Sequence, residues 1–102
     1  MTIKLTSWNV NGIRAASKKQ QFKDWFTGSD ADIINLQEIR ANIDDIPSEL
    51  YNIKDYNSFF TTAEKKGYSG VATYTKEKPA NVFHGLGDLE LDMEGRLLRS
   101  DF

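Results

Sequence analysis

The 102-residue sequence has no cysteine, one histidine and only two prolines. Without cysteine the chain forms no disulfide bond and no thiolate metal site, which is typical of proteins in a reducing compartment. No apolar run approaches the roughly 20 residues that a membrane-spanning helix requires. The first residues also lack the apolar core of a secretion signal. We therefore expect no association with a membrane and a cytoplasmic location, or a nuclear one if the source is eukaryotic.

The composition indicates an ordinary globular chain, since 39% of the residues are hydrophobic and 27% are charged. A chain of this length predicts one domain over residues 1–102. The net charge of −2 does not by itself indicate a nucleic-acid-binding protein. Basic side chains are nevertheless clustered, first at Arg14, Lys18, Lys19 and Lys23 and later at Lys65, Lys66, Lys76 and Lys78. On charge alone, a phosphate-binding face and a normal solvated surface both remain open.

The hydrophobic pattern predicts a strand–helix–strand unit followed by a run of strands. A strand is expected over residues 3–8, a helix over 13–26 and a buried strand over 31–37. The apolar side of the helix is expected to consist of Ile13, Phe22, Trp25 and Phe26. One helical turn is expected at 47–50, and further strands at 57–61, 70–75, 81–84 and 96–102. This order of elements is typical of the α/β (α+β) class.

Two of these strands end in polar side chains. Asn9 and Asn11 follow the first strand, and Glu38 follows the buried strand, 29 positions after Asn9. A strand–helix–strand crossover brings the ends of both parallel strands to one edge of the sheet, where open α/β sheets bind ligands. A carboxylate with side-chain amides is an oxygen donor set that suits Mg²⁺. These residues therefore predict a Mg²⁺ (or Mn²⁺) site, although Asn9 and Asn11 also suit turn positions that need no metal.

Four segments of the sequence resemble a known family of nucleases. They are SWNVNGIRA near the start, LQE at 36–38, GYSGVA at 67–72, and GLGD followed by EGR near the end. In order and spacing they are similar to the exonuclease III-type apurinic/apyrimidinic endonucleases of the endonuclease/exonuclease/phosphatase superfamily. The resemblance implies Mg²⁺-dependent hydrolysis of double-stranded DNA 5′ to abasic sites. It also implies that the chain forms the N-terminal half of a four-layered α/β sandwich with two pseudo-symmetric halves.

The resemblance implies roles for individual residues as well. Glu38 matches the family's principal metal-ligand glutamate, Asn9 matches the asparagine beside it, and Asn11 stands where members carry Asp or Asn. The residues at positions that touch the DNA backbone in relatives are Arg14, Lys19, Gly67 and Tyr68, with Arg40 where relatives often have lysine. Ordinary roles on a solvated helix or in a hairpin turn remain open for these residues.

The family's catalytic tyrosine, Asp-x-Asn pair and Ser-Asp-His segment have no counterpart in the sequence, so no catalytic residue is assigned. The single histidine, His84, does not match the catalytic one and is expected to be a structural residue at a strand end. Metal-assisted hydrolysis needs a group that activates the nucleophile as well as the ion. We therefore expect a truncated or split enzyme, inactive alone, whose partner is a complementary C-terminal half. The alternatives are a non-catalytic module that binds metal or nucleic acid, and a fragment that pairs with itself.

The half-fold interpretation also predicts an exposed sheet face. Candidates for that face, or for the helix-covered one, are Ile3, Leu5, Ile33, Val71 and Leu97. An apolar patch of more than a few hundred Å² and an unpaired sheet edge favour dimerisation, aggregation or binding of a hydrophobic dye.

Overall fold

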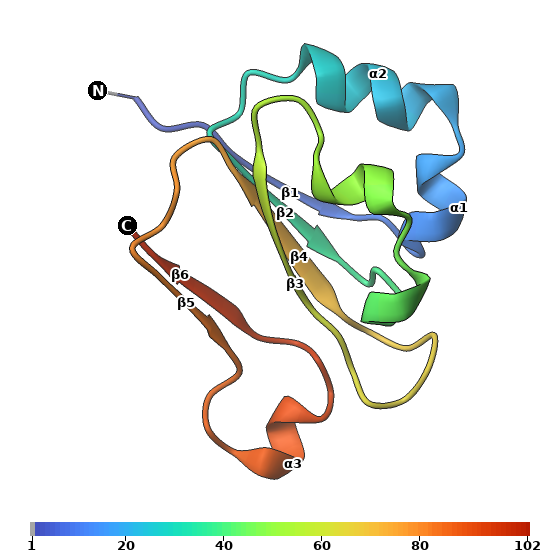
Figure 1. Cartoon of the computed structure of the whole chain (residues 1–102), viewed down its shortest axis with the longest axis vertical. Coiled ribbons are helices and arrows are strands. Elements are labelled where there is room, and N and C mark those ends of the chain that lie inside the picture. Colours follow the sequence, from blue (N-terminus) through green and yellow to red (C-terminus); the bar gives the residue numbers. More distant parts are fainter. Residues whose placement is uncertain (1) are drawn as a thin grey trace.

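The computed structural model describes residues 2–102, in which a four-stranded sheet carries helices on one face and a two-stranded hairpin on part of the other (Figure 1). The elements are, in chain order, β1 (Leu5–Asn9), α1 (Ile13–Ser17), α2 (Gln20–Gly28), β2 (Ile33–Gln37), the 3₁₀ turns η1 (Ile43–Asp45) and η2 (Ser48–Tyr51), β3 (Asn57–Thr61), β4 (Val71–Thr75), β5 (Asn81–His84), α3 (Leu89–Asp92) and β6 (Leu98–Asp101). The six predicted strands are confirmed with small shifts of their ends, whereas the single turn α3 was not predicted. No helix in this described part is long and apolar enough to cross a bilayer.

The main sheet is mixed and has the strand order β1-β2-β4-β3. β1 and β2 are parallel, whereas β4 is antiparallel to both of its neighbours. The predicted crossover between two parallel strands is therefore confirmed. In the register of the parallel pair, Asn9 lies opposite Gln37. The polar residues that follow the two strands therefore meet at one end of the sheet.

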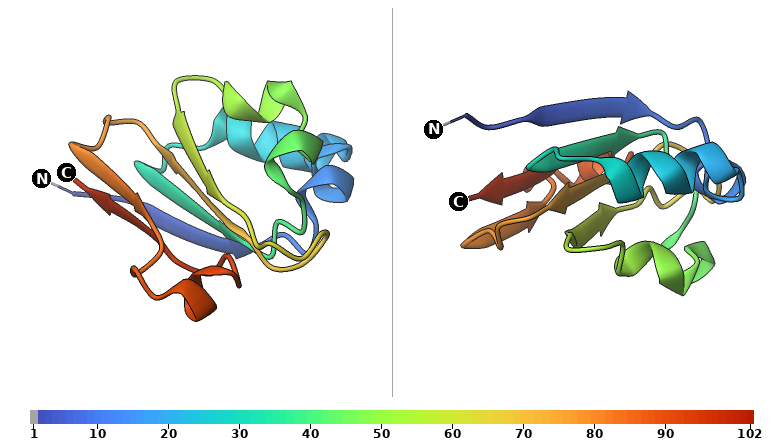
Figure 2. Two further views of the ribbon diagram at one scale, coloured as in Figure 1. Left: turned by 60° about the horizontal axis from the view of Figure 1, so that its bottom comes forward. Right: turned by 90° about the horizontal axis from the view of Figure 1, so that it is seen from above.

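The helix-covered face of the sheet forms the hydrophobic core (Figure 2). Ile34, Leu36 and Tyr74 of the central strands are fully buried there. The rings of Tyr74 and of Phe26 from α2 lie 4.9 Å apart in an edge-on arrangement, which is favourable for aromatic pairs. The Tyr74 hydroxyl donates a hydrogen bond to the carbonyl of Leu50 in η2 at 2.6 Å. This bond fixes the η2 segment on the same face as α2.

The single helix predicted over 13–26 is wrong, because the chain forms two helices separated at Lys18 and Lys19. Lys18 keeps helical backbone angles (φ −76°, ψ −18°), whereas Lys19 is extended (φ −80°, ψ 136°). Ile13 and Phe22 are nine positions apart, or about 2.5 helical turns, so they would face opposite sides of one straight helix. The break turns both side chains into the core, where Ile13 is 0% and Phe22 is 4% exposed.

The hairpin of β5 and β6 covers part of the opposite face. Nδ1 of His84, at the end of β5, lies 2.6 Å from the Thr61 hydroxyl, so His84 joins the hairpin to the main sheet in the structural role expected for it. Towards the β1 edge the sheet is open, and Ile3 and Leu5 are 64% and 62% exposed. The register places Leu5 next to Ile33 on this open face rather than on the helix-covered one.

The centre of the open face is polar. Gln37 Nε2 donates to Ser7 Oγ at 3.0 Å, and Thr73 Oγ1 donates to Asn35 Oδ1 at 3.0 Å. Val71, another candidate for this face, is half-buried. The expected apolar face is therefore interrupted by a row of amide and hydroxyl side chains that bond to one another.

Candidate metal and nucleic-acid site

The two polar strand ends are in direct contact. Asn9 Nδ2 donates a hydrogen bond to Glu38 Oε2, while Asn9 Oδ1 accepts one from the backbone N–H of Asn11 at 3.0 Å. The two loops are also joined through the backbone, where Gly12 N–H donates to the Glu38 carbonyl at 2.8 Å. The side chain of Asn9 therefore uses both of its polar atoms, one to hold the turn and the other to orient the carboxylate.

The Glu38 carboxylate is held in its charged form. The hydrogen bond from Asn9, and after it the one from Arg40, keeps the pKa of Glu38 below its ordinary value. Arg40 Nη2 lies 3.2 Å from Glu38 Oε1, and both side chains are open to solvent. The positive charge of Arg96 acts in the same direction with a smaller effect. Glu38 is thus an accessible anion at neutral pH, which is what a cation site needs.

The backbone is unusual at the same place. Asn11, Glu38 and Arg40 have left-handed φ angles of 48°, 52° and 50°. Asparagine adopts this conformation readily, but glutamate and arginine do so at a cost in free energy. The loop is held in this form partly by the N–H of Arg40, which donates to the Ser69 carbonyl at 2.8 Å. Strained backbone of this kind concentrates at functional sites, so it favours a site over a plain turn.

The donors at the strand ends fit a hard divalent cation. Mg²⁺ commonly takes one or two protein carboxylates and keeps several waters. Glu38 offers the carboxylate and Asn11 an amide oxygen, whereas the amide oxygen of Asn9 already accepts the hydrogen bond from the Asn11 N–H. Across residues 2–102, no group of three or more His, Cys, Asp or Glu side chains is arranged to hold a metal. Any ion at the strand ends would therefore have Glu38 as its one carboxylate ligand and would keep most of its ligands as water.

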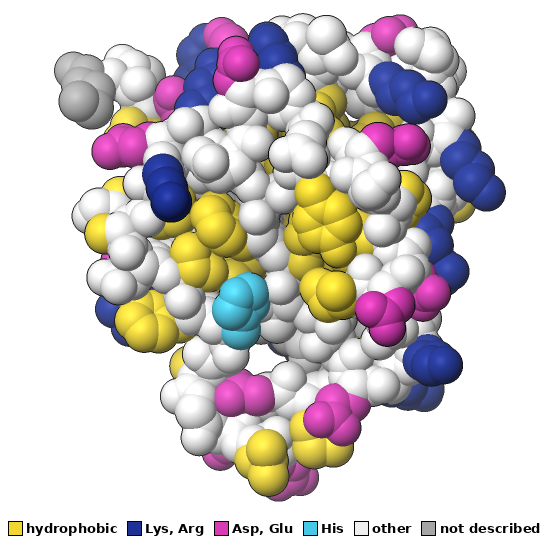
Figure 3. All heavy atoms as spheres, viewed as in Figure 1, with side chains coloured by type: hydrophobic (Ala, Val, Ile, Leu, Met, Phe, Trp, Pro, Cys, Tyr) yellow, Lys and Arg dark blue, Asp and Glu magenta, His cyan; other side chains and the backbone are white. Residues whose placement is uncertain are grey.

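Three of the residues predicted to bind DNA share one hollow. Arg14, Arg40 and Gly67 line a space of about 450 Å³ together with Gly12 and Lys18, among others. Arg14 Nη2 donates to the Arg40 carbonyl at 3.2 Å, which ties α1 to the loop after β2. Lysine and arginine side chains gather along the margin where Figure 1 places α1 and the β3–β4 loop (Figure 3). We call this space the cationic hollow.

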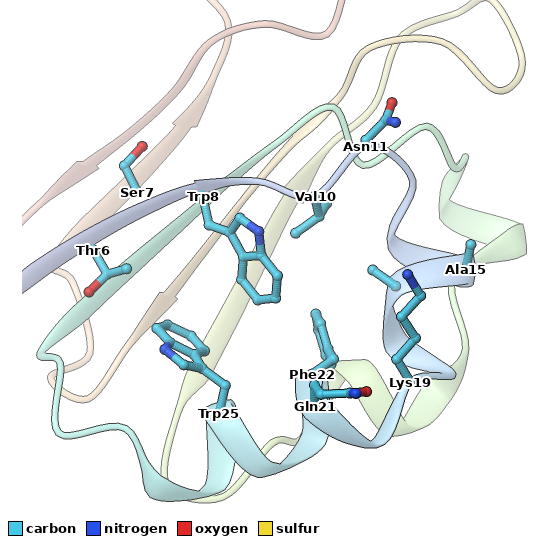
Figure 4. Close-up of a pocket in the computed structure, with 11 residues that line it drawn as sticks. Thr6, Ser7, Trp8, Val10, Asn11, Ala15, Lys19, Gln21, Phe22 and Trp25 are labelled. Carbon is cyan, nitrogen blue, oxygen red and sulfur yellow. The ribbon is translucent and has the colours of Figure 1, made fainter.

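Lys19 lies apart from the cationic hollow. It lines a larger groove of about 1000 Å³ beside β1 (Figure 4). The rings of Trp8 and Trp25 form one wall with centroids 5.4 Å apart, and Trp25 is 37% exposed. Phe22 lies 5.5 Å from Trp8. We call this space the aromatic groove. It shares Ala15 with the cationic hollow, whose lining does not include Lys19.

Tyr68 belongs to a hydrogen-bonded network that the sequence did not reveal. Its hydroxyl donates to Glu94 Oε1 at 2.9 Å and accepts from Arg96 Nη2 at 2.7 Å. The hydrogen bond with Tyr68 is also the main reason why the pKa of Arg96 is raised. Glu94 and Arg96 belong to the EGR segment, but nothing in its spacing from Tyr68 indicates the contact. Tyr68 is thus fixed between two charged side chains on the β3–β4 loop side of the site.

A mixed α/β sheet with a carboxylate–amide pair at its strand ends matches a known class of protein. Residues 6–101 match the endonuclease/exonuclease/phosphatase family. The chain belongs to this family. The resemblance and the fold class predicted from the sequence are thereby confirmed.

Individual relatives share this similarity over part of their length. Exodeoxyribonuclease of Bacillus subtilis is 44% identical over 100 residues, which cover 98% of this chain and 38% of the relative. DNA repair nuclease APEX1 of Danio rerio is 40% identical, over 98% of this chain and 33% of the relative. An AP endonuclease from Archaeoglobus fulgidus superposes with a TM-score of 0.80 and 29% identity, over 97% of this chain and 37% of that structure. The chain therefore spans about a third of the length of these proteins and corresponds to an N-terminal portion.

Proposed function

We propose that this chain supplies the metal-binding side of the active site of a DNA-repair nuclease that hydrolyses phosphodiester bonds. The observation that carries the proposal is the contact between Asn9 and Glu38, which places a charged carboxylate and an amide at the carboxyl ends of two parallel strands. Open α/β sheets bind ligands at these ends. Membership of the family supports the same activity, as do relatives that include an exodeoxyribonuclease and an AP endonuclease.

In this proposal the strand-end residues hold Mg²⁺ (or Mn²⁺). Glu38 binds the ion, Asn11 contributes an amide oxygen, and Asn9 keeps the Glu38 carboxylate oriented. When bound, the ion would neutralise charge on the phosphate group that is cleaved. Arg40 lies against Glu38 and is therefore placed to bind phosphate next to the ion.

The proposed substrate is double-stranded DNA that contains an abasic site. Arg14, Arg40 and the backbone of Gly67 would contact the DNA backbone, which positions the strand without reading its sequence. The Tyr68 hydroxyl donates to Glu94, so Tyr68 would contact a phosphate only by exchanging that hydrogen bond. Cleavage would fall 5′ to the abasic site. Relatives named as endonucleases for apurinic or apyrimidinic sites support this choice of lesion.

A complementary C-terminal portion of the family fold would supply the remaining chemistry. Hydrolysis needs a group that activates water and a group that polarises the phosphate, in addition to the ion. His84 does not serve either purpose in this proposal, because it is engaged with Thr61 where the hairpin meets the sheet. We therefore expect the 102 residues alone to bind metal without cleaving DNA.

A Mg²⁺ titration followed by calorimetry or NMR tests the metal site on the chain itself. The wild type is expected to bind in the micromolar range or more weakly, since most of the ion's ligands would be water. Glu38→Gln keeps the shape of the side chain but loses its charge, and it is expected to abolish binding. Glu77→Gln, at an exposed glutamate between β4 and β5, is the matched control and should bind like the wild type. Equal binding by the wild type and Glu38→Gln would remove Glu38 from the site.

The same variants test the activity on a labelled duplex with one abasic site. The chain alone is expected to leave the duplex intact in Mg²⁺. Addition of the C-terminal portion of the Bacillus subtilis relative, which the match does not cover, is expected to produce Mg²⁺-dependent incision that Glu38→Gln abolishes. If metal binds but the mixture never cleaves, the non-catalytic alternative is favoured. Incision by the chain alone that is lost in Glu38→Gln would contradict the need for a second portion.

A further inference from the structure

The pairing between β2 and β4 becomes irregular where the proposed metal ligand lies. Gln37, the last residue of β2, pairs with Val71. A regular ladder would next pair Glu38 with Gly70, but it is the N–H of Ile39 that donates to the Gly70 carbonyl, at 3.2 Å. Glu38 is one residue more than the ladder can pair, and its φ of 52° is left-handed. An extra residue of this kind is a β-bulge, which bends the strand and re-aims a side chain.

Gly70 leaves room for the residue that follows the bulge. The Ile39 side chain is 0% exposed. A Cβ added at Gly70 would lie 2.7 Å from Ile39 Cγ1 and 3.3 Å from its Cδ1. A packed interior has few voids, so an extra methyl group at this place would force its neighbours to move. The missing side chain of Gly70 is therefore what allows Ile39 to keep its place.

Ile39 in turn keeps Glu38 in its orientation. The Ile39 carbonyl accepts a hydrogen bond at 2.9 Å from the N–H of Ile13, the first residue of α1, so Ile39 is bonded both to α1 and to Gly70. Glu38 directly precedes Ile39, and its carboxylate accepts a hydrogen bond from Asn9 Nδ2. Asn9 belongs to β1 and would not follow a movement of Ile39. Displacing Ile39 would therefore turn the carboxylate away from Asn9.

We propose that Gly70 is a positioning residue of the metal site: because it has no side chain, Ile39 fits against it and keeps the bulged residue Glu38 aimed at Asn9 and at the ion. The inference rests on the proposed function, in which Glu38 binds Mg²⁺, and deepens it by naming a residue that acts on this ligand through its neighbour. Gly70 is not expected to touch the ion or the DNA. It sets the affinity of the metal site from the β4 side of the sheet.

An NMR titration of two glycine variants with Mg²⁺ separates the contact with Ile39 from the strain of the backbone. Gly70→Ala is expected to weaken Mg²⁺ binding about tenfold, the usual effect of removing the support of a metal ligand. Gly87→Ala, between β5 and α3, is the matched control, because the φ angles of Gly70 and Gly87 are +87° and +92°. A Cβ at Gly87 would meet no other atom of residues 2–102 within 4 Å, its chain neighbours aside. Gly87→Ala should therefore bind Mg²⁺ like the wild type although its backbone is similarly strained.

A double-mutant cycle with Ile39→Ala identifies the contact. Ile39→Ala removes the two side-chain atoms nearest to the added Cβ, so Gly70→Ala should change the Mg²⁺ affinity by less than about twofold in this background. Ile39→Ala alone should weaken Mg²⁺ binding, whereas Ile34→Ala should not, although both isoleucines are 0% exposed and both substitutions leave a cavity. The two isoleucine variants also test the inference if Gly70→Ala does not fold. Circular dichroism verifies that each variant is folded at the temperature of the titration.

The side-chain amide of Asn9 provides a readout that needs no metal. Its Nδ2–H signal in the NMR spectrum reports the hydrogen bond to Glu38. In the metal-free protein this signal is expected to shift in Gly70→Ala, where the bond is lost, and to stay unchanged in Gly87→Ala.

The inference and the proposed function fail in different ways. Equal Mg²⁺ affinities of the wild type and Gly70→Ala, or equal losses in Gly70→Ala and Gly87→Ala, would show that the contact with Ile39 does not position Glu38. An Asn9 signal that stays unchanged in Gly70→Ala would refute the inference as well. If the wild type binds no Mg²⁺, the proposed function fails, and the Asn9 signal alone decides whether Gly70 positions Glu38.

Discussion

The buried hydroxyl of Tyr74 provides a quantitative test of the fold that positions the site. Tyr74 is 0% exposed, and its hydroxyl donates to the Leu50 carbonyl at 2.6 Å. Tyr74→Phe keeps the ring that packs against Phe26 but leaves this carbonyl without its partner. Leaving a buried acceptor unsatisfied costs about 1–3 kcal/mol. For a domain of this size each kcal/mol lowers the melting temperature by about 4–8 °C.

The matched control is Tyr51→Phe. The Tyr51 hydroxyl donates to the Ile43 carbonyl at 3.2 Å in an exposed position, so its loss should change the free energy of unfolding by no more than about 0.5 kcal/mol. Urea unfolding followed by circular dichroism measures both variants. Equal effects of the two substitutions would refute the argument that burial sets the value of this hydrogen bond.

Tyr74 also predicts a loss of stability in base. Burial raises the pKa of the Tyr74 phenol well above its ordinary value of 10.0. A group whose pKa is raised in the folded state makes its full contribution to the free energy of unfolding below its unfolded pKa. This contribution to stability falls as the pH rises further. The wild type should therefore lose stability above about pH 10 more steeply than Tyr74→Phe. If the free energy of unfolding fell equally with pH in the two proteins, the loss of stability in base would not come from Tyr74.

Two further predictions concern the hairpin and the carboxylate. Gly95→Ala would place a Cβ 2.3 Å from the Ala63 nitrogen at a φ of +63°, and it should lower the free energy of unfolding by about 2 kcal/mol or more. Gly28→Ala is the control, because a Cβ there meets no atom within 4 Å, and it should be neutral or stabilising. Thermal unfolding measures both variants. Because the pKa of Glu38 is lowered, its contribution to stability is complete above its ordinary pKa of 4.5 and is lost as the pH falls further. Glu38→Gln should therefore show a shallower acid dependence than the wild type between pH 4.5 and about pH 2 in urea unfolding. An unchanged acid profile would show that Asn9 and Arg40 do not stabilise the charged form.

The contact between Asn9 and Glu38 was predictable because the topology leaves little choice about which strand ends meet. A crossover between parallel strands fixes which ends meet, so the positions of Asn9 and Glu38 in the sequence were enough to bring them together. The break in the first helix was missed because an apolar pattern shows which residues are buried but not whether one straight helix can bury them. The spacing of nine positions between Ile13 and Phe22 shows that one straight helix cannot bury both, because it places them on opposite sides of the helix axis.

The remaining site residues depend on tertiary structure that no local pattern encodes. Tyr68 meets Glu94 and Arg96 only because the β3–β4 loop and the segment after α3 come together in space. The separation of Lys18 from Lys19 depends on the ψ angle of a single residue, and two consecutive lysines are indistinguishable by charge or periodicity. Sequence reasoning therefore predicted the contact between Asn9 and Glu38 better than it predicted the contacts of the residues around them.

The aromatic groove gives the molecule a built-in optical probe. The chain has two tryptophans, and both of them, Trp8 and Trp25, line this groove beside β1. Intrinsic tryptophan emission therefore reports on the β1 side of the sheet and on the part of the core beside α2, because Trp8 packs on Phe22 and Trp25 packs on Phe26. A segment that adds to the β1 edge and covers the groove will shift the emission to shorter wavelength, whereas events confined to the cationic hollow will leave it unchanged.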